Sequence, residues 1–301
     1  MHDIIIIGGG PAGLTAAVYA RRAGKSVLVL EKSAFGGQIT WAPRVENFPG
    51  FMSITGAELG DKLLEQAMAQ GAEVELEEAI GIRRDAEGFA VRCDSGAEFR
   101  ARSIILATGA RPRRLGLARE AELLGSGVSY CAVCDGAFYR GRAVAVVGGG
   151  SSALQDALLL SETCERVYLI HRRAELRGER KLAETLHKRE NVEFVLESTV
   201  TELLGDDTLR GVAVEQRGER RELAVDGLFI AIGSEPENDL FEPLLCLDEA
   251  GCADAGEDCA TQTPGVFVAG DCRRKPVRQL TTAVADGAVA ALAAVRFLDG
   301  E

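Results

Sequence analysis

Two cysteines, Cys131 and Cys134, stand three positions apart and are followed directly by an acidic residue, Asp135. In a Cys-x-x-Cys pair, neighbouring groups stabilise one thiolate, and that thiolate attacks a partner disulfide through a mixed disulfide. The carboxyl group of Asp135 could transfer the proton that this exchange requires. The pattern therefore indicates thiol–disulfide exchange. The alternative for Asp135 is an ordinary turn residue before Gly136.

The other cysteines do not extend the pair into a different kind of site. They are dispersed, and we expect most of them to be inert small residues: Cys93, Cys164, Cys246, Cys252 and Cys259. The chain has three histidines and no second Cys-x-x-Cys, so we expect no metal site. No histidine lies near the pair in sequence, which disfavours a Cys–His hydrolase.

A strand, a glycine-rich turn and a helix occur twice in the chain. The first copy has an apolar strand over residues 3–7, the turn Gly8–Gly13 and an Ala-rich helix to about residue 23. The second copy has a strand over residues 143–147, the turn Gly148–Ala153 and a helix through residue 160. Such GxGxxG or GxGxxA turns are typical of dinucleotide-binding βαβ units, in which a pyrophosphate approaches the backbone at the helix N-terminus.

Each copy continues into a second strand, residues 26–30 in the first copy and 166–170 in the second, and the residues that follow these two strands differ in charge. Glu31 follows Gly8 by 23 positions, and His171 follows Gly148 by the same number. An acidic residue there accepts hydrogen bonds from a ribose and repels a 2′-phosphate, whereas arginines suit a phosphate. Because Arg172, Arg173 and Arg177 accompany His171, we expect FAD in the first unit and NADPH in the second. The alternative is a solvated basic turn.

The C-terminal region has no counterpart in the second copy. A strand over residues 266–269 precedes Gly270-Asp271 and an Ala-rich helix from about residue 280 to 298. We therefore expect this region to complete the first unit. The predicted fold is α/β, with two Rossmann-like dinucleotide-binding domains of the three-layer FAD/NAD(P)-binding type, the second inserted into the first. Residues 1–114 and 246–301 form the FAD domain, and residues 115–245 form the NADPH domain that carries the cysteine pair.

Composition excludes several classes of partner. The 301 residues carry a net charge of −12, which disfavours nucleic acid as a partner. No run of 18 apolar residues occurs, so we expect no membrane span. The N-terminus enters an apolar strand without a basic leader or cleavage site, so we expect a cytoplasmic protein.

Several further stretches carry a resemblance to a known family. They are Phe35–Ile39, Val45–Gly50, Leu106–Gly109, Gly265–Asp271 and Arg278-Gln279. Together with both glycine-rich turns, Cys131–Gly136 and the His171–Arg177 cluster, their order and spacing resemble the low-molecular-weight bacterial thioredoxin reductases over essentially the whole chain. That family belongs to the class II pyridine nucleotide-disulfide oxidoreductases.

The resemblance implies roles for individual residues. Cys134 would lie against the flavin, Cys131 would attack the partner disulfide, and Asp135 would be the acid–base group. The implied FAD-binding residues are Gly8, Gly10, Pro11, Ala12, Gly13, Glu31, Lys32, Gly37, Gln38, Asn47, Ala107, Thr108, Gly109, Gly270, Asp271, Arg278, Gln279 and Leu280. The implied NADPH-binding residues are Gly148, Gly150, Ser151, Ser152, Ala153, His171, Arg172, Arg173, Arg177, Ile232 and Gly233. The family also implies a homodimer, two alternating domain arrangements, and thioredoxin or a thioredoxin-like protein as the electron acceptor.

Two places depart from the family pattern near the cysteine pair. Ser126-Gly127 stands where Arg-Gly is usual, and Ala137-Phe138 stands where two aromatics are usual, so the thioredoxin-docking surface is altered. A basic run, Cys272–Lys275, also follows Asp271. We expect it to be a solvated loop, and the alternative is an electrostatic dock for an acidic protein.

Three other functions are compatible with parts of the sequence. A small-dithiol oxidase would use FAD and the cysteine pair, but the NADPH signature argues against it. A ferredoxin-fed reductase of the same fold would leave the His171–Arg177 cluster without a purpose. The Cys-x-x-Cys-Asp sequence argues against a non-catalytic nucleotide-binding or redox-sensing module.

Overall fold

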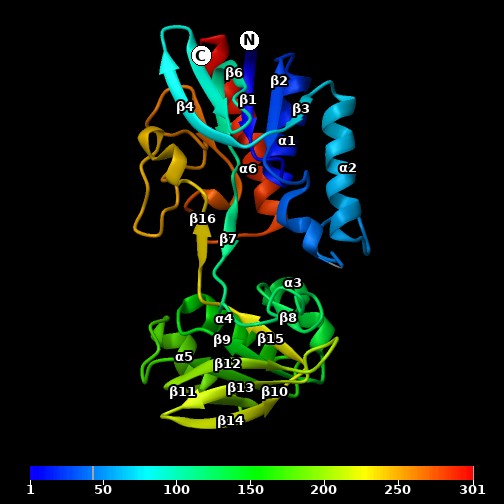
Figure 1. The fold of residues 1–301 in the computed structure, drawn as a ribbon, viewed down its shortest axis with the longest axis vertical. Helices are drawn as coiled ribbons and strands as arrows, with labels where there is room; N and C mark the ends of the chain where they lie inside the picture. Colours follow the sequence, from blue (N-terminus) through cyan, green and yellow to red (C-terminus); the bar gives the residue numbers. More distant parts are fainter. Residues whose placement is uncertain (43, 301) are drawn as a thin grey trace. The chain divides into compact units, whose positions relative to one another are not determined.

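The computed structural model describes residues 1–42 and 44–300 and divides the chain into two compact units (Figure 1). The terminal unit consists of Met1–Arg111 and Glu235–Glu301, and the inserted unit consists of Pro112–Ser234. The chain therefore re-enters the terminal unit at residue 235, not at residue 246 where we expected it. The reason is a buried apolar group in the earlier segment: Phe241, Leu244 and Leu245 belong to the core of the terminal unit.

A seven-stranded sheet forms the centre of the terminal unit. Its order is β3-β2-β1-β6-β5-β4, and β17 also pairs with β6. The strands are β1 (His2–Ile7), β2 (Val27–Glu31), β3 (Glu73–Leu76), β4 (Ala79–Asp85), β5 (Gly88–Cys93), β6 (Glu98–Leu106) and β17 (Val266–Val268). Strands β1, β2, β3, β6 and β17 pair in parallel, whereas β4 and β5 add an antiparallel meander. Because parallel strands are covered on both faces, β1 reads as an uninterrupted apolar run, Ile4–Ile7.

Helices from the two ends of the chain pack on each other against this sheet. They are α1 (Pro11–Arg22) and α6 (Leu280–Asp299), which lie side by side in Figure 1. Ala16, Ala17, Ala290 and Ala294 are buried in one shared core, so small side chains allow the two helices to approach closely. The remaining segments are α2 (Gly56–Ala69) and the 3-10 turns η1 (Gly37–Trp41), η3 (Asp239–Leu244) and η4 (Gly270–Cys272).

Helix α6 is the one helix in the described ranges that is long and apolar enough to cross a membrane, by length and composition alone. We expected no such segment because no run of 18 apolar residues occurs. The helix is nevertheless apolar on average, because the residues that interrupt its apolar sequence include Thr and Gly rather than many charged residues. Its buried face, which includes Ala290, Ala291 and Ala294, belongs to the core that also contains α1.

The inserted unit has three layers. A parallel five-stranded sheet has the order β11-β10-β9-β15-β8, and a separate antiparallel sheet has the order β12-β13-β14. Alternate residues of β9 face opposite layers: Val144 and Val146 pack with helix α4, whereas Ala145 and Val147 pack with the smaller sheet. The strands are β8 (Val128–Ser129), β9 (Ala143–Val147), β10 (Arg166–His171), β11 (Val192–Leu196), β12 (Ser198–Leu204), β13 (Gly211–Gln216), β14 (Glu219–Ala224) and β15 (Gly227–Ile230). The helical segments are α3 (Ala132–Asp135), η2 (Gly136–Tyr139), α4 (Ser151–Ser161) and α5 (Arg180–Leu186).

The two chain crossings between the units pair with each other. Strands β7 (Ala110–Pro112) and β16 (Ser234–Pro236) form a two-stranded sheet. On one side of it Arg113 N donates to Gly233 O at 2.9 Å, and on the other Glu237 N donates to Gly109 O at 3.4 Å. Both crossings therefore run through one hydrogen-bonded ribbon.

The contact between α1 and α6 yields a stability test at Gly287. A Cβ atom at this position would lie 2.1 Å from Ala12 O, so an alanine forces the two helices apart. Overpacking lowers the free energy of unfolding by about 1–3 kcal/mol, whereas the higher helix propensity of alanine raises it by only about 1 kcal/mol. We expect Gly287→Ala to lower the free energy of unfolding in urea. The matched control is Gly81→Ala, since an added Cβ there meets nothing within 4 Å. A Gly287→Ala protein as stable as the control would contradict the close contact.

Candidate functional site

The two cysteines of the pair lie at the start of the short helix α3 in the inserted unit. They form a disulfide with a Cα–Cα distance of 5.3 Å. Cys131 is the N-cap residue of α3 and is half-buried, while Cys134 is exposed. Cys134 N donates a hydrogen bond to Cys131 Sγ at 3.2 Å. This backbone donor would stabilise negative charge on the Cys131 sulfur when the disulfide is reduced.

Asp135 is joined to the cysteine pair through a serine that the sequence analysis did not single out. Ser129 Oγ donates to Asp135 Oδ2 at 2.6 Å and accepts a hydrogen bond from Cys131 N at 3.0 Å. Burial raises the pKa of Asp135, and the Ser129 hydrogen bond opposes this shift. The available sequence signal was weak, because Ser129 is one small polar residue at the end of a two-residue strand.

The first glycine-rich turn lies against the end of β6 in the terminal unit. Gly8 has φ +110°, and a Cβ there would lie 2.2 Å from Ala107 O. A Cβ at Gly13 would lie 1.9 Å from Gly8 O, whereas a Cβ at Gly10 would meet only Gly37 Cα at 4.0 Å. The turn therefore packs tightly against the sheet at Gly8 and Gly13 and leaves free space beside Gly10. Gly10 is the N-cap residue of α1, and no side chain caps this helix start. These residues fit a bound pyrophosphate at the start of α1.

The carboxylate of Glu31 lies beside this turn. It is 8% exposed, and Oε2 accepts a hydrogen bond from Gly9 N at 2.7 Å. Oε1 accepts from Ser33 N at 2.9 Å. Because each carboxylate oxygen has two lone pairs, Glu31 can still accept from a ribose hydroxyl. Its neighbour Lys32 forms an ion pair with Glu237 at 2.6 Å, and Glu237 also pairs with Arg111.

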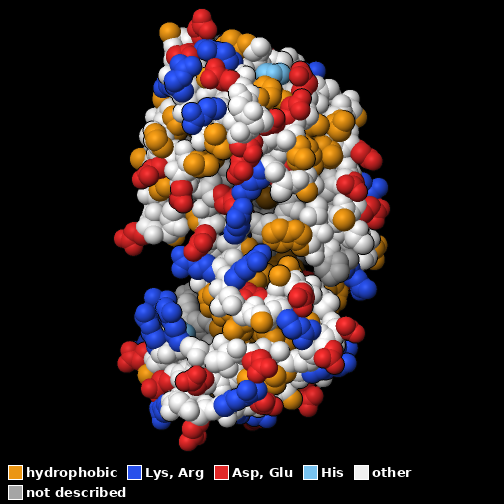
Figure 2. All heavy atoms as spheres, in the orientation of Figure 1, with side chains coloured by type: hydrophobic (Ala, Val, Ile, Leu, Met, Phe, Trp, Pro, Cys, Tyr) orange, Lys and Arg blue, Asp and Glu red, His pale blue; other side chains and the backbone are white. Residues whose placement is uncertain are grey.

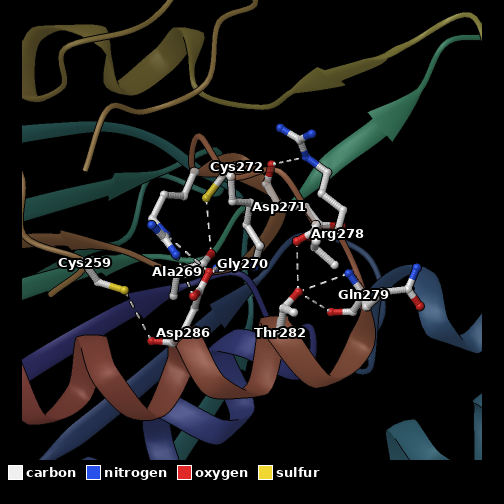
Figure 3. Close-up of polar contacts among 12 residues, drawn as sticks. Cys259, Ala269, Gly270, Asp271, Cys272, Arg278, Gln279, Thr282 and Asp286 are labelled. Atoms are coloured by element: carbon white, nitrogen blue, oxygen red, sulfur yellow. Dashed lines mark hydrogen bonds and ion pairs between the residues drawn. The ribbon is translucent and has the colours of Figure 1, made fainter. Parts of the chain in front are cut away.

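Asp271 has a buried oxygen without a partner. Its Oδ1 atom makes no hydrogen bond within the described residues. Burial raises the pKa of Asp271, while the charges of Lys275 and Arg278 oppose this shift. Figure 3 shows Asp271 on the segment that leads to α6, with Arg278 Nε donating to the Asp271 carbonyl oxygen at 3.4 Å. An orphaned acceptor of this kind fits the hydroxyl groups of a ribityl chain.

The basic run after Asp271 is not a solvated loop, so that expectation was wrong. Arg273 is 7% exposed, and its guanidinium pairs with Asp286 at 2.8 Å. Lys275 also pairs with Asp286 at 2.8 Å, with 5% of its side chain exposed. Only Arg274 of the three is exposed, and it pairs with Asp254. With two of its three charges buried and neutralised, the run also does not form the alternative electrostatic dock.

The buried carboxylate of Asp286 organises the segment around Asp271. Asp286 Oδ2 accepts a hydrogen bond from Gly270 N at 3.1 Å, next to Asp271 (Figure 3). Burial alone would raise the pKa of Asp286, but its hydrogen bonds to Arg273 and Lys275 hold that pKa below 3.8. Cys272 in the same run is buried, its Sγ lies 3.3 Å from Ala269 O, and burial raises its pKa. This thiol is therefore a packing residue of the segment.

Other residues of the expected FAD site lie in the terminal unit and meet in small groups. Asn47 Nδ2 donates to Gln279 Oε1 at 3.4 Å, and Gln279 caps α6 one residue before Leu280. Gln38 Nε2 donates to Ala110 O at 2.6 Å, close to Gly109. Thr108 Oγ1 donates to Asn238 Oδ1 at 3.4 Å. The structure thus brings together residues that lie far apart in sequence.

The second glycine-rich turn repeats the geometry of the first in the inserted unit. Gly148 has φ +155°, and a Cβ there would lie 2.3 Å from Ala231 O, just before Ile232 and Gly233. A Cβ at Gly150 would meet nothing within 4 Å. Gly150 is the N-cap of α4, which begins at Ser151 without a side-chain capping bond. This turn therefore also fits a pyrophosphate.

The basic cluster adjoins this second turn. His171 is 6% exposed, its Nε2 has no hydrogen-bond partner in the described ranges, and a Cβ at Gly149 would lie 2.3 Å from its ring. Burial lowers the pKa of His171, and the charges of Arg177, Arg173 and Arg172 act in the same direction. The three arginines are exposed, and no ion pair of theirs is found within residues 1–42 and 44–300. Figure 2 shows Lys and Arg side chains gathered at one edge of the inserted unit, on the side where α5 lies.

A charge-removing change at Asp286 tests its role in the terminal unit. Asp286→Asn leaves two buried cations without a counter-charge, and breaking a buried pair in this way costs about 3–5 kcal/mol. Because Asp286 also accepts from Gly270 N, we expect the variant to retain less FAD on purification. Thermal unfolding and the flavin absorbance of the purified protein measure the two effects.

The matched control is Arg274→Gln, which removes only an exposed ion pair, worth about 0–1 kcal/mol. The lowered pKa of Asp286 means that its stabilisation is present above pH 3.8 and is lost as the pH falls through the lower folded-state value. Asp286→Asn should therefore lose less stability than the unchanged protein on acidification. An Asp286→Asn protein as stable as the control would contradict the buried pair.

Comparison with known proteins finds relatives that match nearly the whole chain. The sequence model of the pyridine nucleotide-disulphide oxidoreductase family matches residues 2–287. The thioredoxin reductase of Listeria innocua is 41% identical over 305 aligned residues, covering 99% of this chain and 94% of that protein. The bifunctional thioredoxin reductase/thioredoxin of Mycobacterium leprae is 40% identical, covering 99% of this chain and 66% of that protein.

The fold is shared with solved structures. The crystal structure of thioredoxin reductase from Streptococcus pyogenes superposes with a TM-score of 0.94 at 37% identity, covering 100% of this chain and 99% of that chain. This similarity confirms the predicted α/β fold of two Rossmann-like domains.

Proposed function

We propose, from the chain's membership of the thioredoxin reductases within the pyridine nucleotide-disulphide oxidoreductase family, that it is an NADPH-dependent flavoprotein disulfide reductase. It passes electrons from NADPH through FAD to the Cys131–Cys134 pair and then to thioredoxin or a thioredoxin-like protein. The observation that carries the proposal is the Cys131–Cys134 disulfide, with Asp135 joined to it through Ser129. FAD, when bound, supplies the two-electron transfer between a nicotinamide and the disulfide.

The residues of the pair divide the exchange between them. In the reduced state Cys131 is a thiolate, Cys134 is a thiol and Asp135 is protonated. The Cys131 thiolate attacks one sulfur of the partner disulfide, and the partner's other sulfur leaves as a thiolate that takes the proton of Asp135. Cys134 then gives its proton to the Asp135 carboxylate and attacks Cys131 Sγ, which breaks the mixed disulfide. The second partner thiolate takes a proton from water. Two electrons have moved to the partner, and the Cys131–Cys134 disulfide has formed again.

The two dinucleotide sites follow from the two turns. We propose that the terminal unit holds FAD, with its pyrophosphate at Gly8–Gly13, its adenosine ribose at Glu31 and its ribityl chain at Asp271. Asp271 Oδ1, which is buried and has no hydrogen-bond partner among the described residues, supports this placement. In the inserted unit, Gly148–Ala153 would hold the pyrophosphate of NADPH, and Arg172, Arg173 and Arg177 would hold the 2′-phosphate. Burial lowers the pKa of His171, so the arginines are the main positive charges offered to the phosphate.

The proposal extends to partner, assembly and location. The family relationship supports a homodimer, and the cytoplasm is supported by five free cysteines that are buried, since thiols stay reduced there. Around the pair, Val133 and Ala137 are exposed, so thioredoxin would dock on small apolar side chains, with Ala137 standing where the family pattern has an aromatic.

The exposed arginines yield a test of cofactor preference. Each charge-assisted bond to a 2′-phosphate is worth about 1.5–3 kcal/mol, or about 10- to 100-fold in binding. We expect Arg172→Gln and Arg173→Gln to raise the KM for NADPH by about that factor and to leave the KM for NADH unchanged. Steady-state kinetics with both nucleotides measure the effect. Arg180→Gln is the control, because Arg180 is exposed on the same segment but pairs with Glu184. Equal changes for NADPH and NADH would show that the cluster is a solvated turn.

The cysteine pair yields the central test. We expect Cys131→Ser and Cys134→Ser each to abolish thioredoxin reduction, while NADPH oxidation with ferricyanide continues, because ferricyanide takes electrons before the disulfide. Cys134→Ser should trap thioredoxin through Cys131 as a mixed disulfide on a non-reducing gel. Cys246→Ser is the control, since Cys246 is an exposed free cysteine outside the pair. A trap that forms only in Cys131→Ser would reverse the two roles. Thioredoxin reduction by either variant would remove the pair from the mechanism.

A further inference from the structure

One buried hydroxyl group contacts both the acid–base residue and the backbone of the attacking cysteine. Ser129 is 2% exposed at the end of β8. Its Oγ atom lies 2.6 Å from Asp135 Oδ2, 3.0 Å from Cys131 N and 3.4 Å from Cys131 O. Within the described ranges, Ser129 is the one hydrogen-bond partner of the Asp135 carboxyl group.

The hydrogen-bonding capacity of this hydroxyl suits both protonation states of Asp135. A serine hydroxyl has one proton and two lone pairs. When Asp135 is ionised, the Ser129 hydroxyl donates a hydrogen bond to the carboxylate, and one of its lone pairs accepts a hydrogen bond from Cys131 N. When Asp135 is protonated, its carboxyl O–H can donate a hydrogen bond to the second lone pair of Ser129 Oγ. The Ser129 hydroxyl can then rotate and donate to Cys131 O. Every buried donor therefore keeps an acceptor in both states.

The surroundings leave Asp135 dependent on this one contact. Burial raises its pKa, and the Ser129 hydrogen bond is the one opposing influence in the described chain. Helix α4, which packs on α3, carries Asp156, whose pKa burial raises to about 6. The turn η2 carries Tyr139, near which Arg142 and Asp226 also lie. No cation among these groups lowers the pKa of Asp135.

We propose that Ser129 is the positioning residue for proton transfer by Asp135. It holds the carboxyl group at the Cys131 end of the pair, and it lets that group lose and regain a proton without leaving a buried polar atom unpaired. The inference rests on the proposed function, in which Asp135 gives a proton to the partner's leaving thiolate and takes one from the Cys134 thiol.

Removal of the hydroxyl should change the pH dependence of thioredoxin reduction. A hydrogen bond to a charged group is worth about 10- to 100-fold, or about one to two pKa units. We expect Ser129→Ala to lower kcat with a purified bacterial thioredoxin by about that factor and to move the kcat–pH profile upward by about one unit or more. The KM for thioredoxin and the NADPH–ferricyanide activity should not change. Ser129→Thr, which keeps a hydroxyl, should restore the profile.

A double substitution separates this role from a structural one. In an Asp135→Asn background, Ser129→Ala should have little further effect on kcat, because the two residues act as one unit. An equal loss in both backgrounds, or an unshifted pH profile in Ser129→Ala, would overturn the inference. If Ser129→Ala fails to fold, Ser129→Thr and Ser129→Val have the same shape and differ in the hydroxyl, and identical profiles for these two would also overturn it.

Each failure has a distinct signature. Full activity of Asp135→Asn would remove Asp135 from the proposed mechanism, and the Ser129 inference with it. Loss of activity in Asp135→Asn with an unchanged Ser129→Ala protein would overturn the Ser129 inference alone. The activities of Cys131→Ser and Cys134→Ser decide the proposed function independently of both.

Discussion

Two backbone carbonyl groups, those of Ala107 and Ala231, set the geometry on which both halves of the molecule depend. Each lies so close to a turn glycine that a Cβ atom would come within 2.2 Å at Gly8 and 2.3 Å at Gly148. The turns can therefore fold tightly against the neighbouring strand. Neither α1, which starts with Pro11, nor α4 has a side-chain cap for the backbone N–H groups of its first turn. An anion-binding helix start is the direct result of this contact, and the chain builds it twice.

Charge is arranged locally against an acidic background. In the terminal unit, Asp286 neutralises Arg273 and Lys275 in the interior and also binds Gly270 N, so one carboxylate stabilises the core and fixes the segment of Asp271. In the inserted unit, the arginines after His171 remain exposed. The first arrangement serves structure, and the second leaves positive charge available to a ligand. In the sequence the two segments look alike, because each is a short run of basic residues.

That similarity explains where sequence reasoning succeeded and where it failed. Local periodicity and glycine spacing predicted both βαβ units, and the Cys-x-x-Cys spacing predicted the redox pair, because these features depend on residues close in sequence. The burial of Arg273 could not be predicted, since its partner Asp286 lies on a helix and the contact depends on the tertiary fold. Ser129 was missed for the same reason, because its importance comes from distances to Asp135 and Cys131. The return of the chain to the terminal unit at residue 235 could not be predicted either. It depends on the burial of Phe241, and Phe241 lies in a short 3-10 turn whose sequence does not reveal which core it joins.

The division of the terminal unit between the two ends of the chain has a consequence for biosynthesis. Its core needs α1 from the N-terminal segment and α6 from the C-terminal segment, and β17 must pair with β6. The inserted unit, residues 112–234, is complete in sequence before either β17 or α6 has been synthesised. On the ribosome the inserted unit can therefore fold first. The apolar faces of the N-terminal strands and of α1 stay exposed to solvent until β17 and α6 have been synthesised. Because those last contacts join distant parts of the chain, the terminal unit should fold late and should be the half that most needs chaperone protection during synthesis.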